Sequence, residues 1–219
     1  MTNMEEDFEG AIKRLVRPVR GFPNPDFVFG DITPLLADAK AFGAVIGTLA
    51  ERYKDAGLTA IAAPEARGFF FGPPLARELG LPFIPIRKSG QLPGPAHTSE
   101  TTQMDYGSRV LQVHDVSVLS FCPGTVVIVD DILATGGSAL ACVQVLKELG
   151  FQVTELAVVY DYSDGDSVLH GKSALEAAGI AVHKLATFCK DGDMRWWLER
   201  GMEDEVVTSP YIGKISKEH

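Results

Sequence analysis

The sequence predicts an α/β domain in which helices flank a central parallel sheet. Three observations support this fold class. First, apolar segments with strand character alternate along the chain with segments of helical period. Second, residues 125–131, "TVVIVDD", contain a continuous apolar run of the kind that forms a strand buried on both faces. Third, a chain of 219 residues with 46% hydrophobic and 22% charged side chains suits one globular domain with a full core.

Five segments show the spacing of an amphipathic helix. In chain order they are residues 5–16, 40–57, 74–79, 138–150 and 172–179. The second segment is the strongest, because its apolar side chains recur at helical spacing: Phe42, Val45, Ile46, Leu49 and Tyr53. Gly57 and Gly80 follow the second and third helices and suit the left-handed conformation in which helices often end.

Six segments read as strands, because they are short, apolar and rich in β-branched residues. They cover residues 58–64, 81–86, 108–114, 125–131, 153–160 and 180–188. Strands that alternate with helices are joined by right-handed crossovers and therefore lie parallel in one sheet.

Two stretches do not follow this alternation. Residues 88–107, "KSGQLPGPAHTSETTQMDYG", are polar and rich in Gly, Pro, Ser and Thr. A loop of this length inside a compact domain is usually functional and often serves as a lid. The second stretch is the charged tail from Lys190 onward.

Composition and charge exclude several classes of protein. The net charge of −9, from 20 basic and 29 acidic residues, argues against nucleic acid as a partner. No apolar run is long enough to cross a membrane, so no membrane partner is expected. The three cysteines form no CxxC pair, which favours reduced thiols and a cytoplasmic location. The five histidines lack the spacing of a zinc site.

The most informative string is "VVIVDDILATGGS", residues 126–138. Asp130 and Asp131 end a central strand, where α/β proteins bind their ligands. A turn of small and hydroxyl residues follows and leads into a helix, an arrangement whose backbone N–H groups bind anions. The turn would bind a phosphate, and the carboxylates would accept hydrogen bonds from neutral hydroxyls. A ribose phosphate carries both groups. The string contains neither a Walker loop nor a GxGxxG motif.

The same string resembles the ribose-phosphate-binding motif of the type I phosphoribosyltransferases, and "ATGG" resembles their adenine branch. Three more segments agree with that branch: residues 21–36, "GFPNPDFVFGDITPLL"; residues 64–94, beginning "PEARG"; and residues 104–107, "MDYG". The resemblance implies a domain over residues 1–189, with a mobile lid loop at 88–107 and a small N-terminal base-binding hood. Residues 190–219 would form a C-terminal extension.

The resemblance also implies a reaction. Family members of this branch transfer the phosphoribosyl group of phosphoribosyl pyrophosphate (PRPP) to N9 of adenine, giving AMP and pyrophosphate in purine salvage. Mg²⁺, carried on PRPP, is the usual cofactor. Residues matching the family's 5′-phosphate turn are Ala134, Thr135, Gly136, Gly137 and Ser138. Asp130 and Asp131 would hold the ribose hydroxyls, and Arg67, Arg87 and Lys88 the pyrophosphate.

The purine and the catalytic acid would contact other segments. By resemblance, Val28, Phe29 and Ile132 bind the base. Asp105 is the catalytic acid, assisted by Arg67 and by Tyr106, which closes over the substrate. The family often has a non-proline cis peptide bond, which would fall at Glu65–Ala66 here. Arg87 and Lys88 would reach the neighbouring subunit's site, which implies a homodimer.

Two departures from the family pattern bear on base specificity. Gly30 stands where the adenine branch usually has Arg, and Asp105 stands where it usually has Glu. Two alternative functions stay open. The first is the same reaction on hypoxanthine or guanine, although enzymes of that kind usually carry Asp at the position of Ala134. The second is a non-catalytic, PRPP-binding regulator.

Overall fold

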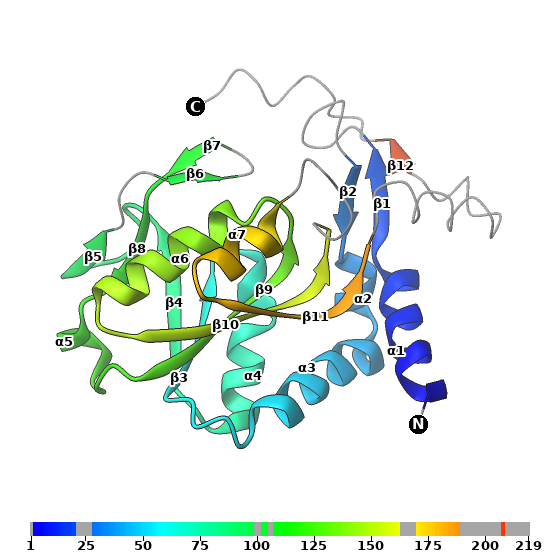
Figure 1. The fold of residues 1–219 in the computed structure, drawn as a ribbon, viewed down its shortest axis with the longest axis horizontal. Helices are drawn as coiled ribbons and strands as arrows, with labels where there is room; N and C mark the ends of the chain where they lie inside the picture. The colour runs from blue at the N-terminus through cyan, green and yellow to red at the C-terminus, as the bar shows by residue number, and fades with distance from the viewer. Residues whose placement is uncertain are drawn as a thin grey trace. The chain divides into compact units, whose positions relative to one another are not determined.

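The computed structural model describes residues 2–20, 28–98, 102–104, 107–162, 170–188 and 207–208 (Figure 1). The chain forms two compact units, residues 1–42 with 188–219 and residues 43–187. Among the described helices, none is long and apolar enough to cross a membrane. Asp105, Tyr106 and most of the tail 190–219 lie outside the described residues.

The larger unit contains a seven-stranded sheet with the strand order β11-β10-β9-β3-β4-β8-β5. In chain order the strands are β3 (Ala60–Pro64), β4 (Phe83–Lys88), β5 (Ala96–Thr98), β8 (Leu111–His114), β9 (Thr125–Leu133), β10 (Gln152–Asp161) and β11 (Ala181–Thr187). The five strands from β11 to β4 pair in parallel. The central parallel sheet is therefore confirmed, and two antiparallel strands, β8 and β5, extend it at one edge.

Helices cover both faces of this sheet (Figure 1). They are α3 (Ala39–Tyr53), the 3-10 helix η1 (Arg67–Phe70), α4 (Gly72–Leu79), α5 (Val116–Leu119), α6 (Gly137–Glu148) and α7 (Gly171–Ala177). Gly72 at the start of α4 packs against Ala63 and Phe83. The side chains next to these in the strands, Ala62 and Ile84, belong to the core under α6. Because strand side chains alternate between faces, α4 and α6 cover opposite faces of the sheet.

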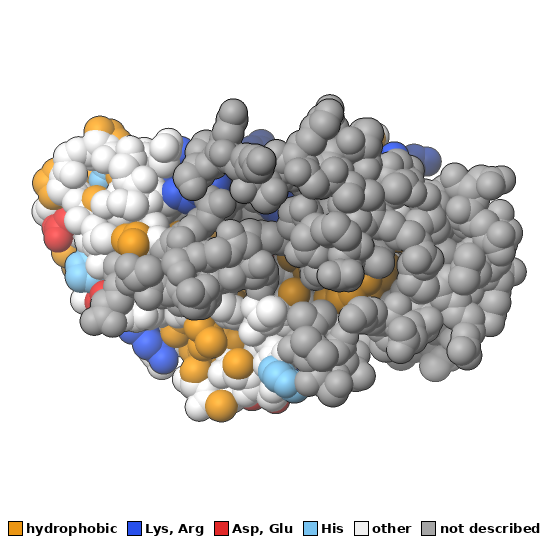
Figure 2. Space-filling view, turned by 90° about the horizontal axis from the view of Figure 1, so that it is seen from above, with side chains coloured by type: hydrophobic (Ala, Val, Ile, Leu, Met, Phe, Trp, Pro, Cys, Tyr) orange, Lys and Arg blue, Asp and Glu red, His pale blue; other side chains and the backbone are white. Residues whose placement is uncertain are grey.

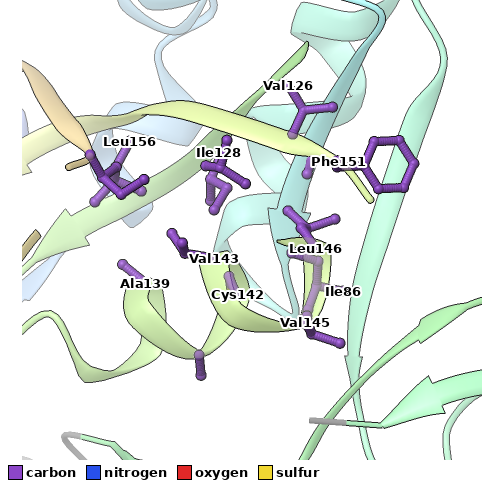
Figure 3. Close-up of a cluster of buried hydrophobic side chains, with 14 of the residues drawn as sticks. Ile86, Val126, Ile128, Ala139, Cys142, Val143, Val145, Leu146, Phe151 and Leu156 are labelled. Carbon is purple, nitrogen blue, oxygen red and sulfur yellow. The ribbon is translucent and has the colours of Figure 1, made fainter. Parts of the chain in front are cut away.

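The core between α6 and the sheet consists mainly of aliphatic side chains, with Phe151 and Cys142 among them (Figure 3). Val126 and Ile128 of β9 and Val145 and Leu146 of α6 are fully buried. Each such side chain contributes roughly 1.5–3 kcal/mol when it is removed from water. This core therefore fixes α6, and with it the turn that precedes the helix.

The ends of two predicted helices fall close to the expected residues because glycines terminate them. Gly80 ends α4 in the left-handed conformation, with φ of 66°, as its position after "PLAREL" predicts. Gly150, with φ of 86°, follows the end of α6 at Glu148. Glycine adopts this conformation without the steric cost that a Cβ would add.

The smaller unit contains α1 (Thr2–Leu15), α2 (Thr33–Ala37) and a three-stranded sheet in the order β12-β1-β2. β1 (Arg17–Arg20) and β2 (Val28–Asp31) pair in antiparallel fashion. β12 (Val207–Thr208) lies parallel to β1, with Val207 opposite Val19. The helix expected at residues 5–16 is confirmed, whereas β1 and β12 are too short and polar to show a strand pattern.

The polar segment 88–107 has more structure than its composition predicts. It includes β5 and β6 (Thr102–Met104), and β7 (Gly107–Arg109) begins at its end. The continuous strand expected at residues 108–114 was wrong, because the segment divides at Val110. β7 pairs with β6, whereas β8 pairs with β4 and β5, so the two halves follow different partners.

Candidate functional site

The candidate site is built where β9 extends past its neighbour β3. The β3–β9 ladder ends at Ala62 and Ile128, whereas β10 pairs with β9 as far as Leu133. On the β3 side the chain leaves the sheet after Pro64 and turns into η1. Gly68 lets η1 approach β9 closely, since a Cβ there would lie 2.8 Å from the carbonyl oxygen of Val129.

This contact brings Arg67 to Asp131. The distance from Arg67 Nη1 to Asp131 Oδ2 is 3.1 Å, and the Asp131 side chain is completely buried. Within the described part of the chain, neither Asp131 carboxylate oxygen accepts a hydrogen bond of normal geometry. Burial raises the pKa of Asp131, and the charge of Arg67 opposes that rise. A buried carboxylate in this state is suited to accept hydrogen bonds from a ligand.

Asp130 lies on the opposite face of β9, because neighbouring strand residues point in opposite directions. The side chain is half-buried, and its Oδ1 accepts a hydrogen bond from the backbone N–H of Asp131, with an N···O distance of 2.9 Å. Desolvation and then repulsion from Asp131 raise the pKa of Asp130 well above its ordinary value. The two carboxylates thus meet different surroundings, and each would bind a different part of a ligand.

The turn after β9 has the geometry of an anion site. Gly136 occupies the N-cap position of α6 with φ of 81°, a left-handed conformation that favours glycine. Thr135 is exposed, and its Oγ1 accepts the backbone N–H of Gly137 at 3.4 Å. The first N–H groups of α6 and its helix dipole lie at the same end. The predicted turn at residues 134–138 is present between β9 and α6, and its role in binding phosphate stays a prediction.

A third part of the site comes from the loop after β3. The structure has a cis peptide bond between Glu65 and Ala66, at the position that the resemblance implies. Arg87 Nε donates to Glu65 Oε2 at 2.7 Å, and the backbone N–H of Lys88 donates to the same oxygen at 3.3 Å. The Arg87 hydrogen bond is the largest cause that lowers the pKa of Glu65. This contact holds the end of β4 beside the loop that carries Arg67.

Local charge on one face differs from the overall charge of −9. On the described part of the face drawn in Figure 2, Lys and Arg side chains are more prominent than Asp and Glu. Scattered Lys and Arg side chains of this kind are compatible with an anionic ligand even on an acidic protein.

The remaining predicted site residues are those assigned to the base and to acid catalysis. Val28 and Phe29 lie on β2 of the smaller unit, where Phe29 is half-buried. Ile132 is half-buried on β9. Asp105 and Tyr106 lie outside the described residues, so their roles stay predictions.

Sequence reasoning missed three residues that shape the site. Glu65 orients Arg87, Gly68 admits η1 to β9, and Gly171 lies against the turn after β9. The glycine in "PEARG" could have been recognised as a point of close backbone approach. Glu65 and Gly171 carry no local signal, because their partners are distant in sequence.

The fold and the site agree with a known family. The family model of the phosphoribosyl transferase domain matches residues 35–172, which is more than half of the chain. The chain therefore belongs to the phosphoribosyltransferase family.

The relatives define the branch. The chain is 40% identical over 177 residues to adenine phosphoribosyltransferase of Vibrio parahaemolyticus, covering 81% of this chain and 94% of the relative. A solved structure of the enzyme from Thermoanaerobacter pseudethanolicus is 38% identical, with a TM-score of 0.73 over 82% of this chain and 99% of that one. The yeast enzyme, solved with adenine and an imino-altritol bisphosphate, is 31% identical, with a TM-score of 0.71 over 82% and 99%. By this likeness the chain falls among the adenine phosphoribosyltransferases.

Proposed function

We propose that the chain is an adenine phosphoribosyltransferase, which transfers the phosphoribosyl group of PRPP to adenine and releases AMP and pyrophosphate in purine salvage. One observation carries this proposal. An anion-binding turn, two carboxylates and an arginine converge at the ends of β9 and β3. The names of the relatives supply the base.

Each part of PRPP has a matching part of the site. The 5′-phosphate binds at the turn 134–138, where helix N–H groups and hydroxyls donate. Asp131, whose buried oxygens accept no hydrogen bond of normal geometry from the described residues, accepts a ribose hydroxyl. Asp130 accepts a second hydroxyl from the other side of the strand. Arg67, Arg87 and Lys88 bind the pyrophosphate, for which guanidinium and ammonium groups suit the high negative charge.

Mg²⁺ fits this site as an ion carried by PRPP. The described residues contain no group of three His, Cys, Asp or Glu side chains that could hold a metal by themselves. Burial raises the pKa values of both Asp130 and Asp131, and repulsion from Asp131 adds to the rise at Asp130. A cation bound nearby would favour the ionised carboxylates. When carried into the site on PRPP, Mg²⁺ would neutralise part of the charge of the pyrophosphate.

In the reaction, the bond from ribose C1′ to the pyrophosphate oxygen breaks as purine N9 bonds to C1′. Positive charge develops on the ribose ring, and the carboxylates of Asp130 and Asp131 stabilise it. The electron pair of the broken bond leaves with pyrophosphate, the N9 proton passes to solvent, and Asp105 as the acid donates a hydrogen bond to purine N7. Val28, Phe29 and Ile132 contact the base, and Tyr106 closes over it.

We further infer a homodimer in the cytoplasm. Support for the dimer comes from the family resemblance of Arg87 and Lys88, whose counterparts reach a neighbouring subunit. Arg87 donates a hydrogen bond from Nε to Glu65, which fixes the side chain and leaves its two terminal nitrogens to reach the neighbouring subunit. The cysteines form no CxxC pair, which favours reduced thiols and supports the cytoplasm.

Turnover assays with PRPP, Mg²⁺ and a panel of bases test the function. We expect AMP from adenine, with hypoxanthine and guanine much slower. Preference for a 6-oxopurine would move the chain to the other purine branch. PRPP binding without turnover of any base would favour the regulator.

A further inference from the structure

The start of α7 lies directly on the turn that follows β9. The backbone N–H of Gly171 donates to the carbonyl oxygen of Ala134, with an N···O distance of 3.0 Å. A Cβ on Gly171 would lie 2.3 Å from that oxygen, 2.7 Å from Leu133 Cδ1 and 2.9 Å from the nitrogen of Gly136. These distances are shorter than van der Waals contact, so no side chain fits at residue 171 without moving the turn.

The contact is reciprocal. A Cβ on Gly136 would lie 2.9 Å from Gly171 Cα and 3.1 Å from Gly171 O. Two glycines therefore face each other, and their backbones approach more closely than any other residue pair would allow. Because Gly136 is the N-cap of α6, the contact joins the starts of two helices.

The hydrogen bond from Gly171 also sets the direction of a peptide group. In a trans peptide the C=O and the following N–H point in opposite directions. Binding the Ala134 oxygen to Gly171 therefore aims the N–H of Thr135 away from α7. The preceding carbonyl, that of Leu133, accepts the N–H of Tyr162 at 2.7 Å, so two successive carbonyls are fixed by distant segments.

The hydrophobic core holds this contact between Gly171 and the turn, which we call the glycine clamp. Leu175, one turn further along α7, is completely buried in the cluster that also contains Leu133 and Ala139. Leu133 precedes the turn and Ala139 follows it. Helix α7 and both ends of the turn are therefore anchored in the same close-packed core.

We propose that Gly171 is a positioning residue for the phosphate-binding turn, which fixes the direction of the donors that receive the 5′-phosphate of PRPP. This inference rests on the proposed function for the identity of the ligand. Helix α7 contributes no residue to the predicted site. By this inference it nevertheless controls the affinity for phosphate.

The test compares Gly171→Ala with two matched glycine substitutions. Gly124→Ala also creates a close contact, 2.5 Å from Thr59 Cγ2, but at the opposite end of β9. Gly47→Ala lies in α3 with nothing within 4 Å of the added Cβ. Calorimetry would measure the Kd for ribose 5-phosphate, and steady-state kinetics the KM for PRPP and for adenine.

We expect Gly171→Ala to raise the Kd for ribose 5-phosphate and the KM for PRPP by about tenfold or more. The KM for adenine should change by less than about threefold. Both controls should bind ribose 5-phosphate like the unmodified protein. Unchanged ribose 5-phosphate affinity in folded Gly171→Ala would overturn the proposal. Ribose 5-phosphate binding that weakens as expected, in a protein that turns over no base, would support the clamp and refute the proposed function.

A second measurement applies if Gly171→Ala does not fold. Hydrogen exchange of the unmodified protein, with and without ribose 5-phosphate, reports on the same contact. The proposal requires that the ligand slow exchange at Gly171 and the first turn of α7 together with residues 135–138. Slowing confined to residues 135–138 would overturn it.

Discussion

Asp130 and Asp131 are adjacent in sequence, yet the two faces of β9 give them different neighbours. Asp131 is completely buried and pairs with Arg67, whereas burial and repulsion from Asp131 raise the pKa of Asp130 more than the charge of Arg67 lowers it. A carboxylate whose pKa is raised on folding costs stability whenever it is ionised. The pair therefore serves binding at the expense of the unliganded fold.

Asp130→Asn should consequently stabilise the protein while it lowers turnover. The folded pKa of Asp130 lies above its unfolded value, so the cost is full above the folded pKa and disappears below the unfolded one. At about pH 8 we expect the variant to gain roughly 1 kcal/mol in the free energy of unfolding. The gain should shrink toward about pH 4.

Urea denaturation at several pH values measures this gain. Asp55→Asn, which removes an exposed carboxylate of the same unit, is the control and should change stability little at any pH. A less stable Asp130→Asn at about pH 8 would show that contacts in the folded protein stabilise the ionised Asp130 carboxylate, against this prediction.

Asp105 is the residue on which base chemistry depends in our proposal. Asp is one methylene shorter than the Glu of the related enzymes, and acid catalysis needs hydrogen-bond reach. Asp105→Asn should lower kcat by roughly 10²–10⁴ with little change in PRPP affinity. Asp105→Glu, which keeps the acid, should retain substantial activity. Steady-state kinetics with adenine would measure kcat. An Asn variant that turned over at the normal rate would show that Asp105 is not the catalytic acid.

At the scale of elements, the contact between η1 and β9 decides where Arg67 lies. Gly68→Ala would place a Cβ 2.8 Å from the Val129 carbonyl oxygen and 2.9 Å from Pro64 Cδ. The 3-10 helix must then move away from β9, which should cost roughly 1–3 kcal/mol of stability. Pyrophosphate affinity should fall, because Arg67 is displaced from Asp131.

Thermal denaturation and pyrophosphate calorimetry would measure both effects. Gly47→Ala is the matched control, since its added methyl group meets nothing within 4 Å and lies in a helix. A Gly68→Ala protein with unchanged pyrophosphate affinity would mean that Arg67 does not depend on the η1–β9 contact.

The elements that the sequence predicts well are those with a strong local pattern. The apolar run of β9 and the helical period of α6 each identified their element within two residues at either end. β1 and β12 were not predicted because pairing with other strands, and not a local sequence pattern, gives them their extended structure. The turn 134–138 could be predicted because strand, carboxylates, turn and helix follow one another directly. The Glu65–Arg87 contact joins residues 22 apart and has no local signature.

At the scale of the whole molecule, the proposed homodimer predicts that two defective chains can complement each other. If Arg87 completes the site of the neighbouring subunit, Arg87→Ala and Asp131→Ala each inactivate the homodimer. A mixed dimer would contain one site that carries both defects and one that carries neither. Mixing the two variants should therefore restore part of the activity. No recovery, with subunit exchange demonstrated by mass spectrometry, would favour sites built from single chains.

The parallel pairing of β12 with β1 has a consequence for synthesis on the ribosome. Val207 pairs with Val19, so the last strand of this small sheet emerges long after the first. All strands of the seven-stranded sheet are translated before it, and domains generally fold as the chain emerges. A two-stranded ladder is marginally stable by itself. The smaller unit, which carries Val28 and Phe29, should therefore mature last. A chain interrupted before residue 207 would have a complete phosphate turn but an incomplete base-binding segment.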